Sequence, residues 1–374
     1  MAQPSLPDLP PDELAKLPLM PNPSGAPPDF DTKDTTGPMN LGVTSVFLVI
    51  ATVTLFLRLF TRFKITKRIG LDDLSAGIAF LFAAGTVGLE FYLVDQKVLG
   101  PHSWDVRLIT WMSNSVIRSY VALPIVSNLA NFFTKCSILL FLQRLFPRVA
   151  CPKTAVALWV GLAANFVAYA TLTMWLFVKC IPWKGQAGVP TSCRGSFQLQ
   201  IGIGSSVVNA TTDLYALALA IPSLWLLRMP LKRKISVIGV LAIGLCACGI
   251  SLSLLASLAM RAKTDQLYDL TRKEVTPAML GTIEPLLAIT TASLPTLPSF
   301  WTWLSTEGRA TITRLISGVG TTTVGIQTGH SSKKGSQFHI GDNHSLKSLN
   351  SHGMTLSSDV EHMPSAIQHD APTH

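Results

Sequence analysis

Seven apolar runs in this chain are each long enough to cross a lipid bilayer as a helix. A helix of about 20 apolar residues spans the hydrocarbon core of a membrane. Inside a membrane every backbone polar group needs an internal partner, so such runs predict helices. The runs cover residues 41–60, 71–94, 120–142, 154–178, 204–227, 235–260 and 277–300. We therefore predict an all-α membrane protein, a seven-transmembrane helix bundle surrounded by the lipid bilayer.

The overall composition agrees with this prediction. Of the 374 residues, 48% are hydrophobic and only 14% are charged, with a formal net charge of +9. A soluble domain carries about 25% charged residues. The basic residues gather in short segments between the apolar runs, which is typical of membrane topology signals. Nucleic acid is therefore not an expected partner.

The basic segments also predict the orientation of the bundle, because short cytoplasmic loops are enriched in Lys and Arg. Residues 58–68 hold five basic residues and no acidic one, and further basic residues follow the third and fifth runs. This places the N-terminus outside and the C-terminus in the cytoplasm. The residues assigned to the cytoplasmic face are Arg58, Arg62, Asp72, Asp73, Arg144, Lys232, Arg233 and Lys234.

Asp72 and Asp73 open the second run. A carboxylate at the N-terminus of a helix caps free N–H groups and suits the helix dipole. The alternative is a contact with the preceding basic loop or with a cytoplasmic partner. Outside the seven-helix domain at 41–304, residues 1–40 predict a disordered, Pro-rich arm and residues 305–374 a disordered cytoplasmic tail.

Four ionisable residues lie inside predicted helices: Glu90, Lys135, Asp213 and Glu284. A charge at the bilayer centre costs at least about 2.5–3.5 kcal/mol, so such groups face the bundle interior and pair. We predict an intramembrane polar network in which Lys135 and Asp213 form a structural or switching ion pair. Separate hydrogen bonds to nearby Ser, Thr and Asn residues are the alternative.

Two further features concern shape and covalent structure. Pro222 and Pro295 lie within the fifth and seventh runs, where proline bends a helix, so they are candidate pivots or static kinks. Cys180 and Cys193 share a predicted outer loop, where an oxidising environment favours a disulfide; two free thiols are the alternative. The cysteines form no metal-binding pattern, so no metal site is predicted.

Several separate motifs together resemble the fungal rhodopsin-domain family of seven-helix membrane proteins. They occur at 57–62 with 71–73, 134–146, 180–183 with Cys193, 212–214 with 221–222 and 229–230, and Glu284 with 294–295. The family includes orphan receptors that resemble G-protein-coupled receptors, and membrane proteins encoded beside fungal secondary-metabolite pathways. Retinal is not expected as a cofactor, because its Schiff base needs a lysine in the last helix and residues 277–304 contain none.

The resemblance implies a GPCR-like receptor that senses an unknown ligand through the outer mouth and engages a cytoplasmic partner such as a G protein. The alternative is an accessory membrane protein of a secondary-metabolite biosynthetic pathway, handling or transporting an apolar small molecule. A membrane enzyme using Asp213 or Glu284 as acid or base is a third hypothesis, although no catalytic motif is present. The plasma membrane is the expected location, with an internal membrane as the alternative.

Overall fold

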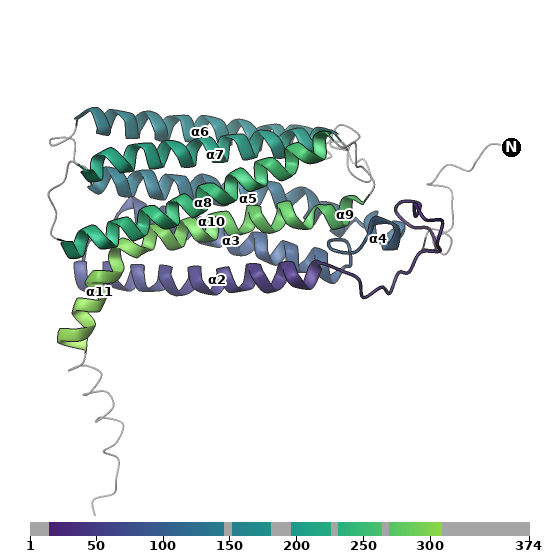
Figure 1. The fold of residues 1–374 in the computed structure, drawn as a ribbon, viewed down its shortest axis with the longest axis horizontal. Helices are drawn as coiled ribbons and strands as arrows, with labels where there is room; N and C mark the ends of the chain where they lie inside the picture. The colour runs from purple at the N-terminus through teal and green to yellow at the C-terminus, as the bar shows by residue number, and fades with distance from the viewer. Residues whose placement is uncertain (1–14, 146–151, 181–195, 226–230, 264–268, 309–374) are drawn as a thin grey trace, which may run out of the picture. The chain divides into compact units, whose positions relative to one another are not determined.

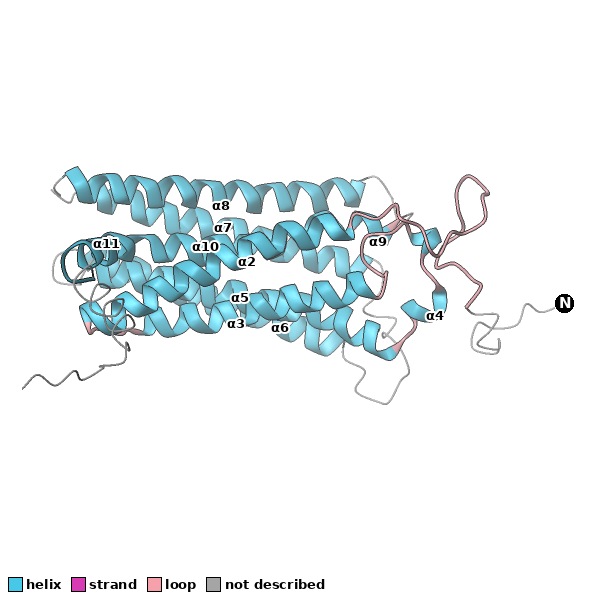
Figure 2. Ribbon diagram, turned by 90° about the horizontal axis from the view of Figure 1, so that it is seen from below, coloured by secondary structure: helices cyan, strands magenta, loops and turns pink. Residues whose placement is uncertain are grey.

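Long helices dominate the computed structural model, which describes residues 15–145, 152–180, 196–225, 231–263 and 269–308. Seven of them run side by side (Figures 1 and 2). They are α2 (Gly37–Phe60), α3 (Leu71–Asp95), α5 (Asn114–Leu145), α6 (Pro152–Cys180), α7 (Ser196–Trp225), α8 (Leu231–Lys263) and α10 (Val275–Ser293). The prediction of an all-α helix bundle is confirmed, and the described residues contain no strand.

Six segments are long and apolar enough to cross a membrane. They are Gly37–Thr66, Leu71–Asp95, Asn114–Arg144, Pro152–Cys180, Gly244–Ala262 and Leu270–Thr306. The remaining long helix, α7, has 30 residues and packs against α6 and α8. It carries several polar side chains that turn toward the other helices, and it is the candidate for the seventh span.

The outward surface of the bundle is apolar, and its interior holds many polar side chains among the apolar ones. Large apolar side chains are exposed along the outward faces of α2 and α6, among them Val46, Val49, Phe56, Val160, Phe166 and Val167. Buried positions include many polar residues, such as Arg58, Glu90, Lys135 and Glu284. Lipid tails solvate the first group, while the second must be satisfied by partners within the protein.

Small residues allow α2, α3, α5 and α10 to pack closely. Their shared core contains the alanines Ala51, Ala76, Ala79, Ala83 and Ala130, each at most 1% exposed, together with Leu55, Val87, Leu286 and Ile289. Small side chains let helix backbones approach, which is the usual basis of helix association in membranes. These four helices therefore form one continuous packed unit.

Helix α2 continues beyond its predicted end. A π-helical segment, η2 (Thr61–Thr66), extends it into the stretch predicted to be a loop, and the turn comes at Lys67, whose φ is 51°. Arg58 and Arg62 are consequently helical residues. An apolar run marks only the membrane-crossing part of a helix, and the backbone hydrogen bonds extend past it.

The seventh predicted helix is broken near its end. After α10 comes a 3₁₀ turn, η5 (Leu294–Thr296), then α11 (Leu297–Trp303), which leaves the direction of α10 (Figure 1), and a final π-helical turn, η6 (Leu304–Gly308). Pro295 and Pro298 lie at the starts of the first two segments. Each lacks the N–H that would continue the helix, which accounts for the change of direction. The use of Pro295 as a pivot stays a prediction.

The N-terminal arm differs from its prediction over residues 15–36. Leu19 N donates to Val106 O and Leu108 N donates to Leu17 O, both at 2.9 Å, so the arm pairs with the α3–α5 connection. That connection contains the turn η3 (Ser103–Asp105) and the short helix α4 (Leu108–Trp111). The lack of apolar periodicity predicted disorder, yet backbone hydrogen bonds order this stretch without an apolar face.

Candidate functional site

Three ionisable side chains meet in the middle of the bundle, from helices α5, α7 and α10. The Nζ of Lys135 contacts Oδ1 of Asp213 and lies 3.4 Å from Oε1 of Glu284. All three are buried, with Glu284 completely enclosed. The structure thus brings together three of the four predicted intramembrane residues and places the predicted pair Lys135 and Asp213 in contact. A flexible lysine stem reaches both carboxylates from one helix.

Neutral side chains extend this contact into a polar core, which we define as Lys135, Tyr169, Asn209, Asp213, Ser251 and Glu284. Ser251 Oγ on α8 donates to Asp213 Oδ2 at 2.7 Å. Asn209 Nδ2 donates to Glu284 Oε2, and Tyr169 OH on α6 donates to Asn209 Oδ1 at 2.7 Å. Five helices, α5, α6, α7, α8 and α10, therefore share one hydrogen-bonded network.

Sequence reasoning missed the neutral members of the polar core. Asn209 lies one turn before Asp213 and so shares its helix face, a signal that the spacing of four residues could have given. Tyr169 and Ser251 lie on other helices, and nothing in their local sequence distinguishes them from the lipid-facing residues nearby. Only the packing of the bundle brings them to the ion pair.

Glu90, the fourth predicted intramembrane residue, lies apart from the polar core. It is completely buried on α3, where Thr282 Oγ1 donates to its Oε1 at 2.6 Å and Asn40 Nδ2 donates to its Oε2 at 3.4 Å. No cation contacts it among the described residues. The prediction of one network with all four ionisable residues is therefore wrong for Glu90.

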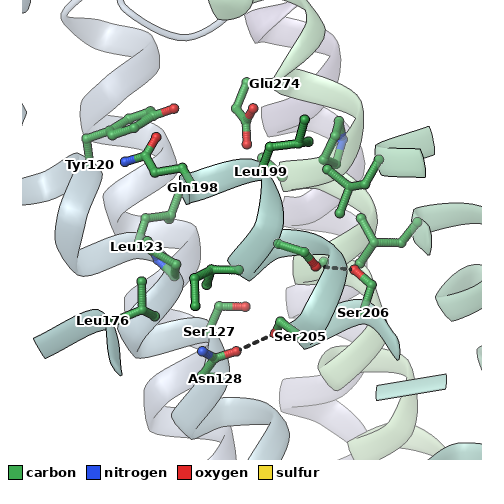
Figure 3. Close-up of a pocket in the computed structure, with 18 of the residues that line it drawn as sticks. Tyr120, Leu123, Ser127, Asn128, Leu176, Gln198, Leu199, Ser205, Ser206 and Glu274 are labelled. Carbon is green, nitrogen blue, oxygen red and sulfur yellow. Dashed lines mark hydrogen bonds between the residues drawn. The ribbon is translucent and has the colours of Figure 1, made fainter. Parts of the chain in front are cut away.

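A cavity of about 380 Å³ opens in the half of the bundle that the charge distribution predicts to be the outer one (Figure 3). Its walls come from α3, α5, α6, α7, α8 and α10. They are mainly apolar and include Leu123, Leu176, Ile201, Leu254 and Leu258. Concave, mostly apolar spaces of roughly 300–1,000 Å³ with a few polar groups are typical small-molecule sites.

The polar residues of the cavity occupy distinct places. Ser127 and Asn128 on α5 face Ser205 on α7, whose Oγ donates to Asn128 Oδ1 at 2.7 Å (Figure 3). Nδ2 of Asn128 has no hydrogen-bond partner in the described part of the chain, although the residue is only 4% exposed. Glu274, at the start of α10, pairs with Arg261 at 2.6 Å.

The cavity and the polar core are neighbours along two helices. On α7, Ser205 and Ser206 line the cavity, and Asn209 of the polar core follows after about one helical turn. On α10, Thr282 lines the cavity and Glu284 belongs to the polar core. A molecule in the cavity would therefore contact α7 and α10, the same two helices that the polar core joins by hydrogen bonds.

At the opposite end of the bundle, Arg58 is completely buried. Its Nη2 donates to Asp72 and its Nε to Asp73, each at 2.8 Å, and Nη1 donates to the carbonyl oxygen of Ala292 at 2.6 Å. Charged donors and acceptors in such geometry make the strongest hydrogen bonds in proteins. One side chain therefore joins α2, α3 and α10.

Two more arginines complete what we call the charge cluster, made of Arg58, Arg62, Asp72, Asp73 and Arg144. The guanidinium of Arg62 lies 3.7 Å from Asp72 and 3.6 Å from Asp73. Arg144 of α5 donates to Asp72 Oδ1 at 3.2 Å and to the carbonyl oxygen of Arg68 at 2.9 Å. Five of the eight residues assigned to the cytoplasmic face thus lie together.

The capping interpretation of Asp72 and Asp73 covers only part of their contacts. Asp73 does accept the N–H of Gly70 at 3.2 Å, as a helix cap would. Both carboxylates are nevertheless buried and paired with arginines, which was the alternative. Arg58 lies in the last turn of α2, at the end of the first predicted run, and its guanidinium is stable there because its N–H groups find acceptors.

Other predicted residues are described only in part. Cys180 is buried at the end of α6, but Cys193 lies outside the described residues, so their disulfide stays a prediction. Pro222 lies within α7, and Lys232, Arg233 and Lys234 open α8, with only their backbone described. The described residues hold no cluster of potential metal ligands.

A second contact network closes the predicted outer end. His102 Nδ1 lies 2.6 Å from Asp269, its Nε2 lies 2.8 Å from Arg272, and its ring stacks on Trp104. Arg272, in the short helix α9 (Leu270–Lys273), also pairs with Asp34 of the arm at 2.9 Å. The hydrogen bond from Arg272 lowers the pKa of the Asp34 carboxyl. This network links the arm to the α3–α5 connection and to the α8–α10 connection.

Comparisons with known proteins agree with this architecture. Residues 57–303 match the fungal rhodopsin domain family. The chain is 25% identical over 240 residues to "Fugralins biosynthesis cluster protein 2" of Gibberella zeae, covering 60% of this chain and 58% of the relative. It is 26% identical over 208 residues to a "SAT4 family membrane protein" of Emericella nidulans, covering 54% and 51%.

The chain thus spans between half and three fifths of the length of these relatives. No solved structure matches it. The family match covers more than half of the chain and includes the polar core, the charge cluster and the break after α10. The protein therefore belongs to the fungal rhodopsin domain family.

Proposed function

We propose that the protein is a GPCR-like receptor that binds a small molecule in the outer cavity and signals through the opposite end of the bundle. The observation that carries this proposal is the position of the cavity directly beside the polar core on α7 and α10. A ligand that binds one arrangement of these helices better than another shifts the equilibrium toward it.

The route to the other end runs along α10. This helix contributes Thr282 to the cavity, Glu284 to the polar core and the carbonyl oxygen of Ala292 to the charge cluster. Beyond Ala292 the helix breaks at Pro295. A small displacement of α10 would change the hydrogen bond of Arg58 and the direction of α11. Arg144, at the edge of the charge cluster, is about one third exposed and available to a cytoplasmic partner such as a G protein.

A second candidate is an accessory role in a secondary-metabolite pathway, in which the same cavity holds an apolar intermediate. The name of the Gibberella zeae relative, a biosynthesis cluster protein, favours this candidate. An enzymatic role receives less support from the geometry, because both carboxylates of the polar core are occupied by contacts between helices.

A cavity-filling variant tests the proposal. A Cβ at Gly281 would meet only Leu254, at 3.9 Å, so Gly281→Leu extends into the cavity without a backbone clash. Gly88→Leu is the matched control, because Gly88 is exposed on α3 with no atom within 4 Å of its Cβ position. Strains carrying the native gene, a deletion or either variant are exposed to a metabolite panel, and early transcript changes and metabolite profiles are measured.

For a receptor, the deletion and Gly281→Leu lose an acute transcript response that Gly88→Leu keeps. For the accessory role, the metabolite profile changes while acute responses are intact. If every acute response persists in the deletion strain, the receptor proposal is wrong.

A further inference from the structure

Glu90 is a buried carboxyl at the cavity wall, and within the described part of the chain no lysine or arginine pairs with it. It is 0% exposed and accepts hydrogen bonds from two neutral donors, Thr282 and Asn40. In contrast, each carboxylate of the polar core and the charge cluster contacts a lysine or an arginine. A charge inside a membrane protein is stable when an opposite charge pairs with it, and such residues mark binding sites.

Hydrogen-bond acceptors exceed donors around Glu90. Oδ1 of Asn40, 0% exposed beside this carboxyl, finds no hydrogen-bond partner among the residues that the structure describes. Thr86, on the cavity wall one turn before Glu90, already donates its hydroxyl to Phe82 O at 3.1 Å and offers only lone pairs. An ammonium group has three N–H donors and no acceptor, so it complements a group of side chains with unused acceptors.

The other ionisable side chains of the cavity do not supply the missing charge. Arg261 and Glu274 pair with each other at 2.6 Å, so their charges cancel. With Glu90 ionised, the described residues of the cavity wall therefore carry one net negative charge. Its walls are otherwise mainly leucine, isoleucine and other apolar groups, which suit a hydrocarbon or aromatic body.

We propose that the cavity selects amphipathic amines, molecules with an apolar body and one protonated amino group, and that Glu90 pairs with the ammonium. This inference rests on the proposed function, since it names the ligand class of the same cavity. Charge-assisted hydrogen bonds contribute about 1.5–3 kcal/mol, so the amine binds at least about tenfold more tightly than a neutral analogue.

Three probes of one shape test the charge. The full chain, purified in detergent at pH 7, is titrated with 4-phenylbutylamine, 4-phenylbutan-1-ol and 4-phenylbutyrate, and the midpoint of thermal unfolding is recorded. We expect the amine to raise the midpoint at about tenfold lower concentration than the alcohol, with the acid weakest. Glu90→Gln keeps one acceptor oxygen for Thr282, offers an amide N–H to Oδ1 of Asn40, and should remove the advantage of the amine. Asp95→Asn, which changes an exposed carboxylate on the same helix outside the cavity, should keep it.

A measurement on the native protein covers the case in which Glu90→Gln fails to fold. Dicyclohexylcarbodiimide modifies buried carboxyl groups, and peptide mass spectrometry separates Glu90 from Glu284. We expect 4-phenylbutylamine to slow modification of Glu90 while leaving that of Glu284 unchanged, and the alcohol to have less effect.

The outcomes separate the two proposals. If the alcohol or the acid matches the amine, or if the amine gives Glu90 no protection, the ligand class is wrong and the cavity remains a binding site. Two results would show that the cavity binds no such ligand: no probe stabilises the native protein, or the amine stabilises Gly281→Leu as well as the native protein. Either result contradicts both the amine inference and the proposed ligand cavity.

Discussion

The ammonium group of Lys135 contacts the carboxylate of Asp213, and both side chains are buried between α5 and α7. The same ammonium lies 3.4 Å from Glu284 of α10, so one positive charge serves two negative ones. Removing the lysine leaves two buried carboxylates without a cation, whereas removing one carboxylate leaves a balanced pair. The polar core should therefore tolerate loss of one acid better than loss of its base.

We predict that Lys135→Met lowers stability by about 3–5 kcal/mol, the usual effect of leaving a buried charge unpaired. Asp213→Asn should be milder, and the double variant should show a coupling energy of about 0.5–3 kcal/mol. Unfolding of the purified protein in detergent measures all three. Glu90→Gln combined with Lys135→Met is the control, because these residues share no contact. Additive effects of Lys135→Met and Asp213→Asn would show that the two residues do not act as a pair.

Arg58 and Arg62 face the same two aspartates at different distances, which gives a matched test of the charge cluster. Arg58→Lys should be strongly destabilising, because a lysine cannot reproduce the fork that reaches Asp72, Asp73 and Ala292 at once. Arg62→Lys should cost less stability than Arg58→Lys, because Arg62 lies 3.6 and 3.7 Å from the same carboxylates and makes no hydrogen bond to them. Thermal unfolding of both variants checks this, and equal losses would contradict it.

A comparison of two tyrosine hydroxyls tests whether the hydrogen bond inside the polar core affects signalling as well as stability. Tyr169 donates to Asn209 of the polar core, and Tyr215 donates to the carbonyl oxygen of Ala157 at 2.6 Å, away from it. Each change to phenylalanine should cost about 1 kcal/mol of stability. Only Tyr169→Phe should also weaken the ligand-dependent transcript response, since only it loosens Asn209 beside the cavity. An equal loss of response in Tyr215→Phe would assign the effect to stability alone.

The docking of the arm should weaken in acid. Hydrogen bonds from Lys97 and Arg272 lower the pKa values of Asp31 and Asp34, respectively. A carboxylate with a lower pKa in the folded state contributes stability that is complete above about pH 4 and is lost as pH falls through the folded pKa. Hydrogen exchange of residues 17–36, corrected for intrinsic pH dependence, should therefore be unchanged from pH 7 to pH 5 and faster below pH 4.

The control for this prediction is the double variant Asp31→Asn and Asp34→Asn. It should show fast exchange in the arm at every pH, while the amides of α5 stay protected. Arm exchange in the double variant that still accelerates below pH 4 would assign the acid response to other groups, with His102 and Asp269 the first to examine.

The sequence predicted the fold well, because apolar runs report on lipid contact whatever the residues pack against. It also identified the ionisable residues of the polar core, since charged groups inside apolar runs are rare and must pair. Asn209, Ser251 and Tyr169 could not be found in this way, because neutral polar residues are common in membrane helices and their partners depend on tertiary packing. The arm was mispredicted for a related reason. Its order comes from backbone hydrogen bonds and ion pairs with distant parts of the chain, which composition does not encode.

The alanine-lined packing of α2, α3 and α5 has a consequence for how this protein changes shape. Helices in such close contact cannot slide without opening voids, so these three act as a fixed frame. Helices α6, α7, α8 and α10 are joined to one another in part through single hydrogen bonds from Tyr169, Asn209 and Ser251, which can break and re-form one at a time. Adjustment to different occupants of the cavity therefore falls to these four helices, while the frame keeps the orientation of the molecule in the membrane.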